Sequence, residues 1–269
     1  MIQICGIVRI SREGYYQGLK EKSADNLKEE LILQLVQALR RKMPKIGGKK
    51  LYRLILPDMR RMEIKLGRDK LFELLRRNAM LIHRKKRYET TTNSFHRFKI
   101  HENLIKGLVP VGINEVFVSD ITYIRLVSSF CYLALITDLY SRKIVGYDIS
   151  TSLNLEGSIR ALQMAIKDKG DLTGLIHHSD RGIQYCSNDY TELLTSNRIQ
   201  ISMAEKGNPY ENAVAERLNG ILKEEFMLGE TFATKDQAFK AVKEAIETYN
   251  EQRPHMSINY MTPNQKYAA

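Results

Sequence analysis

The chain has 269 residues, of which 43% are hydrophobic, and its 42 Lys/Arg exceed its 31 Asp/Glu to give a formal net charge of +11. This length and composition suit one or two folded domains and exclude the disordered, collagen-like and low-complexity classes. No apolar run approaches the roughly 20 residues of a membrane helix, and Gly6 and Arg9 interrupt the start where a secretory signal would continue. We therefore expect a cytoplasmic protein with no membrane partner.

The three cysteines are far apart in the sequence and show no CxxC spacing. This pattern indicates buried reduced thiols at Cys5, Cys131 and Cys186, and neither a disulfide framework nor a zinc site.

Charge is unevenly distributed along the chain. Residues 1–100 carry 25 Lys/Arg and 10 Asp/Glu, a net +15, whereas residues 101–269 carry 17 Lys/Arg and 21 Asp/Glu, a net −4. A basic module joined to a mildly acidic one predicts that the first binds a polyanion, and duplex DNA is the commonest such partner. Ordinary solvated helix faces are the alternative interpretation.

The first 85 residues show apolar side chains at helical spacing. The patterns over 24–43, 51–59 and 71–81 each repeat at three and four residues and are separated by short breaks. Three short basic helices with tight turns predict a helix-turn-helix-like DNA-binding region over 1–85.

Candidate DNA contacts lie at the end of this region. Arg76 and Arg77 on the third helix are two of them, with a solvated face as the alternative. A polar stretch without periodicity follows, and we interpret 86–111 as a basic linker that can lie along a nucleic-acid backbone. The run RKKR at its start adds the candidates Arg84, Lys85, Lys86 and Arg87.

After residue 111 the pattern changes from helical to strand-like. The runs 116–125, 130–138 and 143–149 are rich in Val, Ile, Tyr and Phe and predict an antiparallel meander. Helices are then predicted over 155–166, 188–197 and 212–226 and from Thr234 onward, and strands over 175–178 and 199–203. This order predicts an α/β domain over 112–269, with a mixed five-stranded sheet that is compatible with a ribonuclease-H-like fold.

Three carboxylates stand at unusual places in these elements. Asp120 lies in the middle of the strand VFVSDITYI, where an unpaired carboxylate is costly to bury. Asp180 comes directly after the strand ending LIHHSD, and strand ends in α/β sheets are where ligand-binding groups emerge. Glu216 lies on the helix ENAVAERLNGILKEE, close to one stripe with Asn212 and Lys223.

Each of these acids also has an ordinary explanation when taken alone. Asp120 fits a bulge, Asp180 fits a turn, and Glu216 fits a helix surface. Asp138 and Asp148 are better explained as turn acids near strand ends, where the carboxylate bonds the backbone.

Together, three carboxylates from three elements can bind two oxygen-seeking cations. Magnesium is the natural choice, because it accepts few protein ligands and keeps positions for phosphate oxygens and water. One ion would activate an attacking hydroxyl while the other stabilises the leaving oxygen.

The spacing of these acids resembles a known family. With 35 residues between Asp180 and Glu216, Asp120 upstream and Lys223 seven residues after the glutamate, the pattern resembles the DDE core of retroviral-type integrases and insertion-sequence transposases. The surrounding strings resemble the second-frame protein of the transposases that are encoded in two overlapping frames. These strings are SDITYI, DLYSRKIVGYDIS, HSDRGIQY, SMAEKGNPYENAVAERLNGILKEE and YNEQRPHMSINYMTP, and the likeness extends to ISREGYYQ near the start.

This resemblance implies a ribonuclease-H-like integrase core, preceded by the small all-α region. It implies an enzyme that cuts at element ends and uses the freed 3′-hydroxyls for strand transfer. Its metal ligands would be Asp120, Asp180 and Glu216, which would hold two Mg²⁺ ions per site, with Mn²⁺ able to substitute.

The resemblance also gives further residues a role. Lys223 would contact DNA near the site. Arg253 would pair a phosphate or fix the last helix, and Asn212 would cap the helix or orient Glu216. His178 would support Asp180 from behind or be an ordinary strand-end histidine. Glu211 stands where the family usually has Asp, and we expect activity to survive this change.

The implied partners are double-stranded DNA, as terminal inverted repeats and as target, and further copies of the chain in a homodimer or higher assembly. A first-frame protein or a frameshift fusion is a further expected partner, in a bacterial, nucleoid-associated setting. Two alternatives stay open: a catalytically silent DNA-binding regulator of the element, and a nuclease acting on RNA–DNA hybrids. The basic helical region disfavours the nuclease, because a simple hydrolase does not require it.

Overall fold

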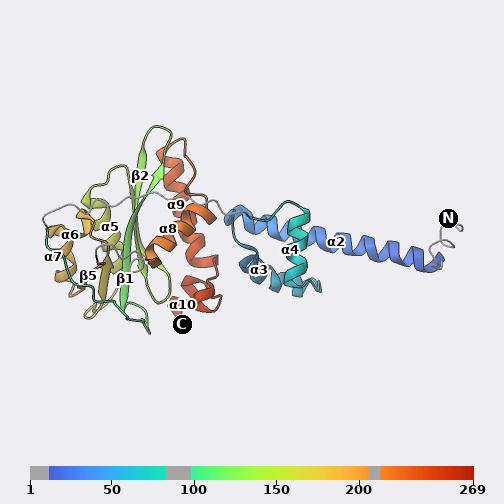
Figure 1. Cartoon of the computed structure of the whole chain (residues 1–269), viewed down its shortest axis with the longest axis horizontal. Helices are drawn as coiled ribbons and strands as arrows, with labels where there is room; N and C mark the ends of the chain where they lie inside the picture. The colour runs from blue at the N-terminus through green and yellow to red at the C-terminus, as the bar shows by residue number, and fades with distance from the viewer. Residues whose placement is uncertain (1–11, 83–97, 206–212) are drawn as a thin grey trace. The chain divides into compact units, whose positions relative to one another are not determined.

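The computed structural model describes residues 12–82, 98–205 and 213–269 (Figure 1). The chain divides into two compact units, Met1–His83 and Arg84–Ala269. Over the described ranges, no helix combines the length and apolar character needed to cross a bilayer.

The described part of the first unit contains the helices α2 (Arg12–Lys42), α3 (Gly48–Arg61) and α4 (Arg68–Arg77), which confirms the three helices predicted from periodicity. α3 packs against both α2 and α4. The buried apolar residues of these helices include Ile32, Val36, Leu51, Ile55, Met59, Leu71, Leu74 and Leu75.

The predicted start of the first helix was wrong, because α2 begins at Arg12 and not near residue 24. Apolar spacing marks only the part of a helix that packs on a core. Once that part is formed, each further residue adds a hydrogen bond at little cost, so the helix can extend beyond the pattern.

The second unit is built on a five-stranded sheet in the order β3-β2-β1-β4-β5. Its strands are β1 (Val116–Arg125), β2 (Phe130–Asp138), β3 (Ile144–Ser150), β4 (Ile176–Ser179) and β5 (Gln200–Met203). β1, β2 and β3 pair antiparallel, whereas β1, β4 and β5 pair parallel. The predicted mixed sheet is therefore confirmed.

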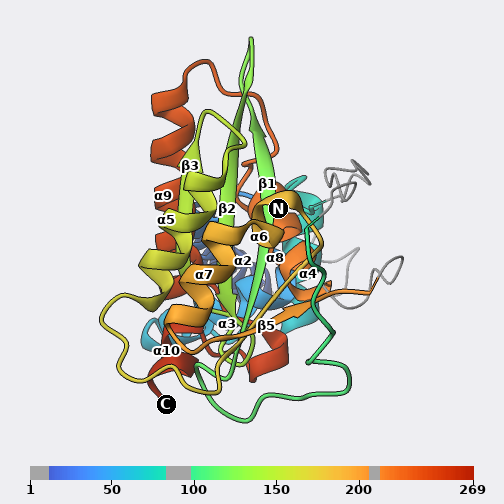
Figure 2. The same ribbon diagram turned by 90° about the vertical axis from the view of Figure 1, so that its left-hand side faces the viewer.

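Helices cover both faces of this sheet (Figures 1 and 2). On one face α5 (Leu155–Ile166), α6 (Ile183–Cys186) and α7 (Asn188–Ser196) enclose the larger core, which includes Phe117 and Leu162. On the other face α8 (Ala213–Glu225) packs Ala215 against Val116 and Val118 of β1.

The chain ends with α9 (Lys235–Gln252), the short 3₁₀ turn η1 (Met256–Ile258) and α10 (Pro263–Ala268). The predicted start of α9 is confirmed, since the Thr234 hydroxyl accepts a hydrogen bond from the Gln237 backbone N–H at 3.3 Å.

A segment ahead of β1 lies along the outer strand of the sheet. The Met203 backbone N–H donates to the Glu102 carbonyl, and the Leu104 N–H donates to the Ser202 hydroxyl. Ile105 packs on the core under α8. This finding corrects the expectation of a linker for this part of 86–111. The sequence did not predict this packing, because an irregular segment at the edge of a sheet shows no periodicity.

Candidate active site

The parallel pairing of β1 with β4 brings two of the three singled-out acids together. The register aligns Ser119 with Ser179, so Asp120 lies beside Asp180, the first residue after β4. Both aspartates line one cavity of about 150 Å³, together with side chains that include Tyr123 and Tyr185.

Asp180 is held in a tight turn. Its Oδ1 accepts a hydrogen bond from the Gly182 backbone N–H at 2.9 Å. A Cβ on residue 182 would lie only 2.9 Å from the same Oδ1, so a larger residue there would displace the Asp180 carboxylate. The turn therefore fixes the direction of the Asp180 carboxylate.

Asp120 is buried close to other acids, and its pKa is raised as a result. Burial raises its pKa, as do the neighbouring charges of Asp180 and, more weakly, Glu216, to about 7. Two hydrogen bonds oppose this rise, from the Ile121 backbone N–H at 2.9 Å and from Asn219 Nδ2 at 2.7 Å. Glu216, in the first turn of α8, thus acts electrostatically on Asp120 across the site.

Asn219 is a site residue that the sequence analysis missed. Its side chain is 7% exposed, and its Nδ2 donates to Asp120 Oδ2. Its Oδ1 is buried and has no hydrogen-bond partner among the described residues. The available signal was position, because Asn219 comes three residues after Glu216 and so lies on the same helix face.

Lys223 lies beside the cavity. Its Nζ is 4.4 Å from the centre of the Tyr123 ring, and Tyr123 lines the cavity with both aspartates. A cation held over an aromatic ring loses some of its freedom to rotate, so the lysine is directed to this side of the site.

Tyr185 also lines the cavity. It is 3% exposed, and its hydroxyl has no hydrogen-bond partner in the described part of the chain. Burial raises the pKa of this hydroxyl well above its ordinary value, and Tyr190, Asp120 and Asp180 add to the rise. The group is therefore a neutral phenol at physiological pH.

The donor set suits a hard divalent cation. Carboxylate oxygens are the ligands that Mg²⁺ prefers, and mutual repulsion among three acids is what a bound cation relieves. The unpartnered Oδ1 of Asn219 adds an oxygen acceptor beside them. In the described ranges, however, no three acid, histidine or cysteine side chains are gathered closely enough to enclose a metal ion.

His178 lies inside the sheet next to this site. It is fully buried, and its Nδ1 hydrogen-bonds the Ser202 hydroxyl on β5 at 2.8 Å. This contact is the one expected of an ordinary strand histidine, so a supporting role toward Asp180 stays a prediction.

Neighbouring His177 is also buried, and its Nε2 lies 2.7 Å from Ser119 Oγ and 3.0 Å from the Tyr190 hydroxyl. Burial, with a smaller effect of His178, lowers the pKa of His177 to about 3. The imidazole is therefore neutral, and this network fixes the strand residue that precedes Asp120.

Arg253 does not lie where a DNA contact needs it. Its side chain is 2% exposed, and its guanidinium donates to both carboxylate oxygens of Glu225, at 2.8 and 2.9 Å, and lies 2.8 Å from His255 Nε2. The prediction of a DNA-binding Arg253 is wrong for this structure, because a fully buried, paired guanidinium cannot reach a phosphate. The structural alternative, a residue that fixes the last helix, describes it.

The other predicted DNA contacts divide into two groups. Arg76 and Arg77 are exposed on α4, and Arg77 Nη2 lies 2.7 Å from Glu29 Oε1. The DNA-binding candidates Arg84, Lys85, Lys86 and Arg87 lie outside the described ranges, as does Asn212, which was expected to cap the helix or orient Glu216.

The two acids set aside as turn residues have different structural roles. Asp138 is a turn acid as predicted, since it accepts from the backbone N–H groups of Asn114 and Ser141. Asp148 is not, because it makes a bidentate ion pair with Arg160 on α5 at 2.8 Å. Among the cysteines, Cys131 and Cys186 are buried free thiols, as predicted, and Cys5 lies outside the described residues.

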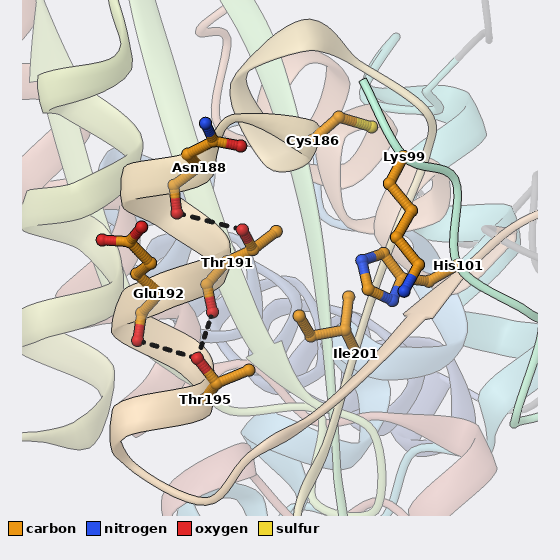
Figure 3. A pocket seen from close by; sticks show the side chains of 8 residues that line it. All are labelled: Lys99, His101, Cys186, Asn188, Thr191, Glu192, Thr195 and Ile201. Atoms are coloured by element: carbon orange, nitrogen blue, oxygen red, sulfur yellow. Dashed lines mark hydrogen bonds between the residues drawn. The ribbon is translucent and has the colours of Figure 1, made fainter. Parts of the chain in front are cut away.

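A second cavity, of about 210 Å³, lies between α7 and the segment ahead of β1 (Figure 3). Lys99 and His101 face α7 across it, and burial with the charge of Lys99 lowers the pKa of His101. No residue that the sequence singled out for the active site lines this cavity.

The comparisons with known proteins agree with this architecture. The family described as "Integrase core domain" matches residues 111–209, and a second family of the same description matches residues 197–263. The "Insertion element IS600 uncharacterized 31 kDa protein" of Shigella sonnei is 33% identical over 264 residues, which cover 97% of this chain and 96% of that protein. "Transposase InsF for insertion sequence IS3A" of Escherichia coli (strain K12) is 27% identical over 268 residues, 97% of this chain and 92% of that protein.

A solved structure shares the fold. A chain of the simian T-cell lymphotropic virus intasome, in complex with PP2A regulatory subunit B56 gamma, matches with a TM-score of 0.50 and 20% identity over 76% of this chain and 68% of that chain. The second unit thus has the ribonuclease-H-like fold. The chain belongs to the insertion-sequence transposases with an integrase-like core.

Proposed function

We propose that this transposase cuts DNA at the ends of its insertion element and joins the freed 3′-hydroxyls to target DNA, with Asp120, Asp180 and Glu216 as its metal-binding acids. The observation that carries the proposal is the register of β1 and β4, which sets Asp120 beside Asp180 in one cavity. The effect of Glu216 on the pKa of Asp120 supports the third acid.

The two aspartates are held in different ways. Asp180 is directed by the turn at Gly182, and Asp120 by hydrogen bonds from Ile121 and Asn219. When bound, Mg²⁺ would supply activation of the attacking hydroxyl and stabilisation of the leaving oxygen. Two ions fit the phosphoryl-transfer chemistry, and Mn²⁺ is expected to substitute because it accepts the same oxygen ligands.

Lys223 is proposed to bind the phosphate backbone next to the reacting phosphodiester. Its position over Tyr123, on the rim of the cavity, supports this role. A lysine in that place would neutralise phosphate charge where three carboxylates otherwise repel it.

The proposed partners are duplex DNA with the element's terminal inverted repeats, target DNA and further copies of the chain. Two element ends must be held together for joint transfer, which favours a dimer or higher assembly on DNA. A first-frame protein, or a frameshift fusion to it, is the proposed source of end recognition.

The test is cleavage and joining of labelled duplexes that carry the DNA flanking this gene, with Mg²⁺ present. The chain, its Glu216→Gln variant and a fusion to any upstream frame are compared. Glu224→Gln is the matched control, since Glu224 is an exposed acid on the same helix. We expect metal-dependent products from the wild type and from Glu224→Gln, and none from Glu216→Gln.

Tight DNA binding without products, even from the fusion, would contradict the enzyme and favour a catalytically silent regulator. Products that persist in Glu216→Gln would contradict the assignment of the third acid.

A further inference from the structure

The side-chain amide of Asn219 is satisfied at one end only. Its Nδ2 donates to Asp120 Oδ2 at 2.7 Å, while its Oδ1 is buried without a partner in the described part of the chain. A buried acceptor left unpaired destabilises a fold, because the group loses its hydrogen bonds to water and gains none in return. A residue that served packing alone would therefore be better replaced by an apolar one.

A second asparagine shows what a structural role looks like. Asn250 on α9 uses both ends of its amide, donating from Nδ2 to the Ile144 carbonyl and accepting at Oδ1 from the Ile144 N–H, each at 3.0 Å. It joins α9 to β3 at the edge of the sheet, and both polar atoms of its amide are hydrogen-bonded. Asn219 differs, because its Nδ2 is bonded to the buried acid Asp120 while its Oδ1 has no partner among the described residues.

We propose that Asn219 is a positioning residue of the active site, which holds Asp120 through Nδ2 and accepts, at Oδ1, a hydrogen bond from an O–H group that enters with the metal or the substrate. This inference rests on the proposed function, since the entering group belongs to the same site.

The placement of Asn219 suits this role. It lies one helical turn beyond Glu216 on α8, so the same rigid element carries an acid and the amide that orients the opposite acid. An ionised carboxylate can only accept, so when Asp120 is ionised, as it would be with a cation bound, Asn219 must turn its N–H toward Asp120. Its Oδ1 is then an acceptor that only an O–H or N–H donor satisfies.

Two donors share this chemistry: a water molecule held by the cation, and the 3′-hydroxyl of the DNA strand. They differ in when they arrive. A metal-held water is present without DNA, whereas the 3′-hydroxyl is present only with DNA that ends in it.

The experiment measures Mn²⁺ binding by electron paramagnetic resonance in the full chain, with no DNA, with 3′-hydroxyl DNA and with 3′-deoxy DNA. The variant is Asn219→Leu, which keeps the volume and removes both hydrogen bonds. Asn250→Leu is the matched control at a distance from the site. Thermal unfolding in EDTA reports on the fold of each protein.

Asn219→Leu is expected to weaken Mn²⁺ binding about 10- to 100-fold, the range for groups that orient metal ligands. Its melting temperature in EDTA is expected to stay close to that of the wild type. The substitution removes the stabilising hydrogen bond from Nδ2 to Asp120, but it also removes the destabilising buried Oδ1. Asn250→Leu is expected to lower the melting temperature and to leave Mn²⁺ affinity unchanged.

If Asn219→Leu weakens Mn²⁺ binding without DNA, the hydrogen-bond donor to Oδ1 is a metal-held water. If it weakens Mn²⁺ binding only with 3′-hydroxyl DNA, the donor is the 3′-hydroxyl of the strand end. Wild-type Mn²⁺ affinity in Asn219→Leu under all three conditions would overturn the inference. If Asn219→Leu does not fold, Asn219→Asp replaces it. That variant sets a carboxylate oxygen against Asp120, so unaltered Mn²⁺ binding there would overturn the inference equally.

The proposed function fails in a different way. It would fail if the wild type bound no Mn²⁺, or bound it as well after Asp180→Asn. The inference alone would fail if Mn²⁺ binding required Asp180 but not Asn219.

Discussion

Asp120 links the charge of the active site to the stability of the fold. Its pKa in the folded protein is about 7, above the ordinary value of 3.8, because of burial and the nearby acids. Between these two pH values the folded protein holds a proton that the unfolded chain has released. Raising the pH through this window therefore lowers the free energy of unfolding, by roughly 4 kcal/mol.

Asp120→Asn is accordingly expected to stabilise the metal-free protein above neutral pH and to change little at acidic pH. Melting temperatures measured in EDTA from about pH 5 to pH 8 check this. Parallel curves for the two proteins would mean that Asp120 titrates normally.

Asp180→Asn is expected to abolish catalysis and to leave DNA affinity nearly intact. The change removes a metal ligand, but it also removes a negative charge that repels phosphate. Strand transfer and fluorescence anisotropy, measured on the same duplex, separate the two effects. Equal losses of binding and of cutting would contradict the assignment.

Arg76 and Arg77 allow a paired test of DNA binding by the helical unit. Both are exposed, but Arg77 is already paired with Glu29. If this unit contacts the DNA backbone, Arg76→Gln should reduce the slope of log affinity against log salt by about 1. Arg77→Gln should reduce it less. Unchanged slopes in both variants would show that neither arginine contacts the DNA backbone.

Single residues also show how far sequence reasoning reaches. It singled out Asp120, Asp180 and Glu216 by their spacing taken together, because each acid alone also has an ordinary structural explanation. It missed Asn219, since an asparagine within a helix carries no such signal. It misplaced Arg253, because the partner that buries it, Glu225, is 28 residues away in the sequence.

At the scale of elements, the packing of α5 on β3 depends on one glycine. A Cβ on residue 146 would lie 2.1 Å from the Ala161 carbonyl oxygen and 2.8 Å from Ala165 Cβ. Gly146→Ala is therefore expected to lower the free energy of unfolding by about 3 kcal/mol or more, the upper range for overpacking.

The control for that substitution lies on α8. A Cβ on Gly220 would meet nothing within 4 Å, so Gly220→Ala should stabilise the helix by about 0.5–1 kcal/mol. Urea unfolding of both variants checks the pair. Similar free energies of unfolding for the two variants would show that α5 can move away from β3 without loss of stability.

The buried pair of Glu225 and Arg253 holds the end of α8 to the segment after α9. Arg253→Met is expected to destabilise the protein by about 3–5 kcal/mol, because it leaves a buried carboxylate without its partner. The double variant with Glu225→Gln should recover part of this loss. Urea unfolding measures both, and a stable Arg253→Met protein with weakened DNA binding would restore the DNA-contact interpretation.

Elements were predicted where their pattern was long or strongly periodic. The three meander strands and α5 emerged from the sequence within a few residues. The four-residue α6 did not, because it is too short to show a period, and the segment along β5 did not, because it is irregular.

For the whole molecule, the sequence predicted an all-α basic region and a mixed-sheet unit, and both are present. The pairing of strands that are far apart in the sequence could not be predicted from the hydrophobic pattern alone. The parallel alignment of β1 with β4 joins segments about 60 residues apart, and the site depends on that register.

Assembly on DNA is the corresponding prediction. We expect sedimentation velocity to show at least two copies of the chain on paired element ends, because joint transfer needs two active sites. A matched duplex without the terminal repeats serves as the control. Monomers alone on paired ends would contradict the prediction.

Helix α8 carries Glu216, Asn219 and Lys223 along its length and is fixed at its last residue, Glu225, by Arg253. All of the proposed catalytic codons therefore precede the codon for the arginine on which their helix depends. A premature stop ahead of codon 253 would leave every one of those codons intact in the gene and still release the helix. An element could thus be silenced by a late truncation, and a genome survey that looked only for the three acids would count it as active.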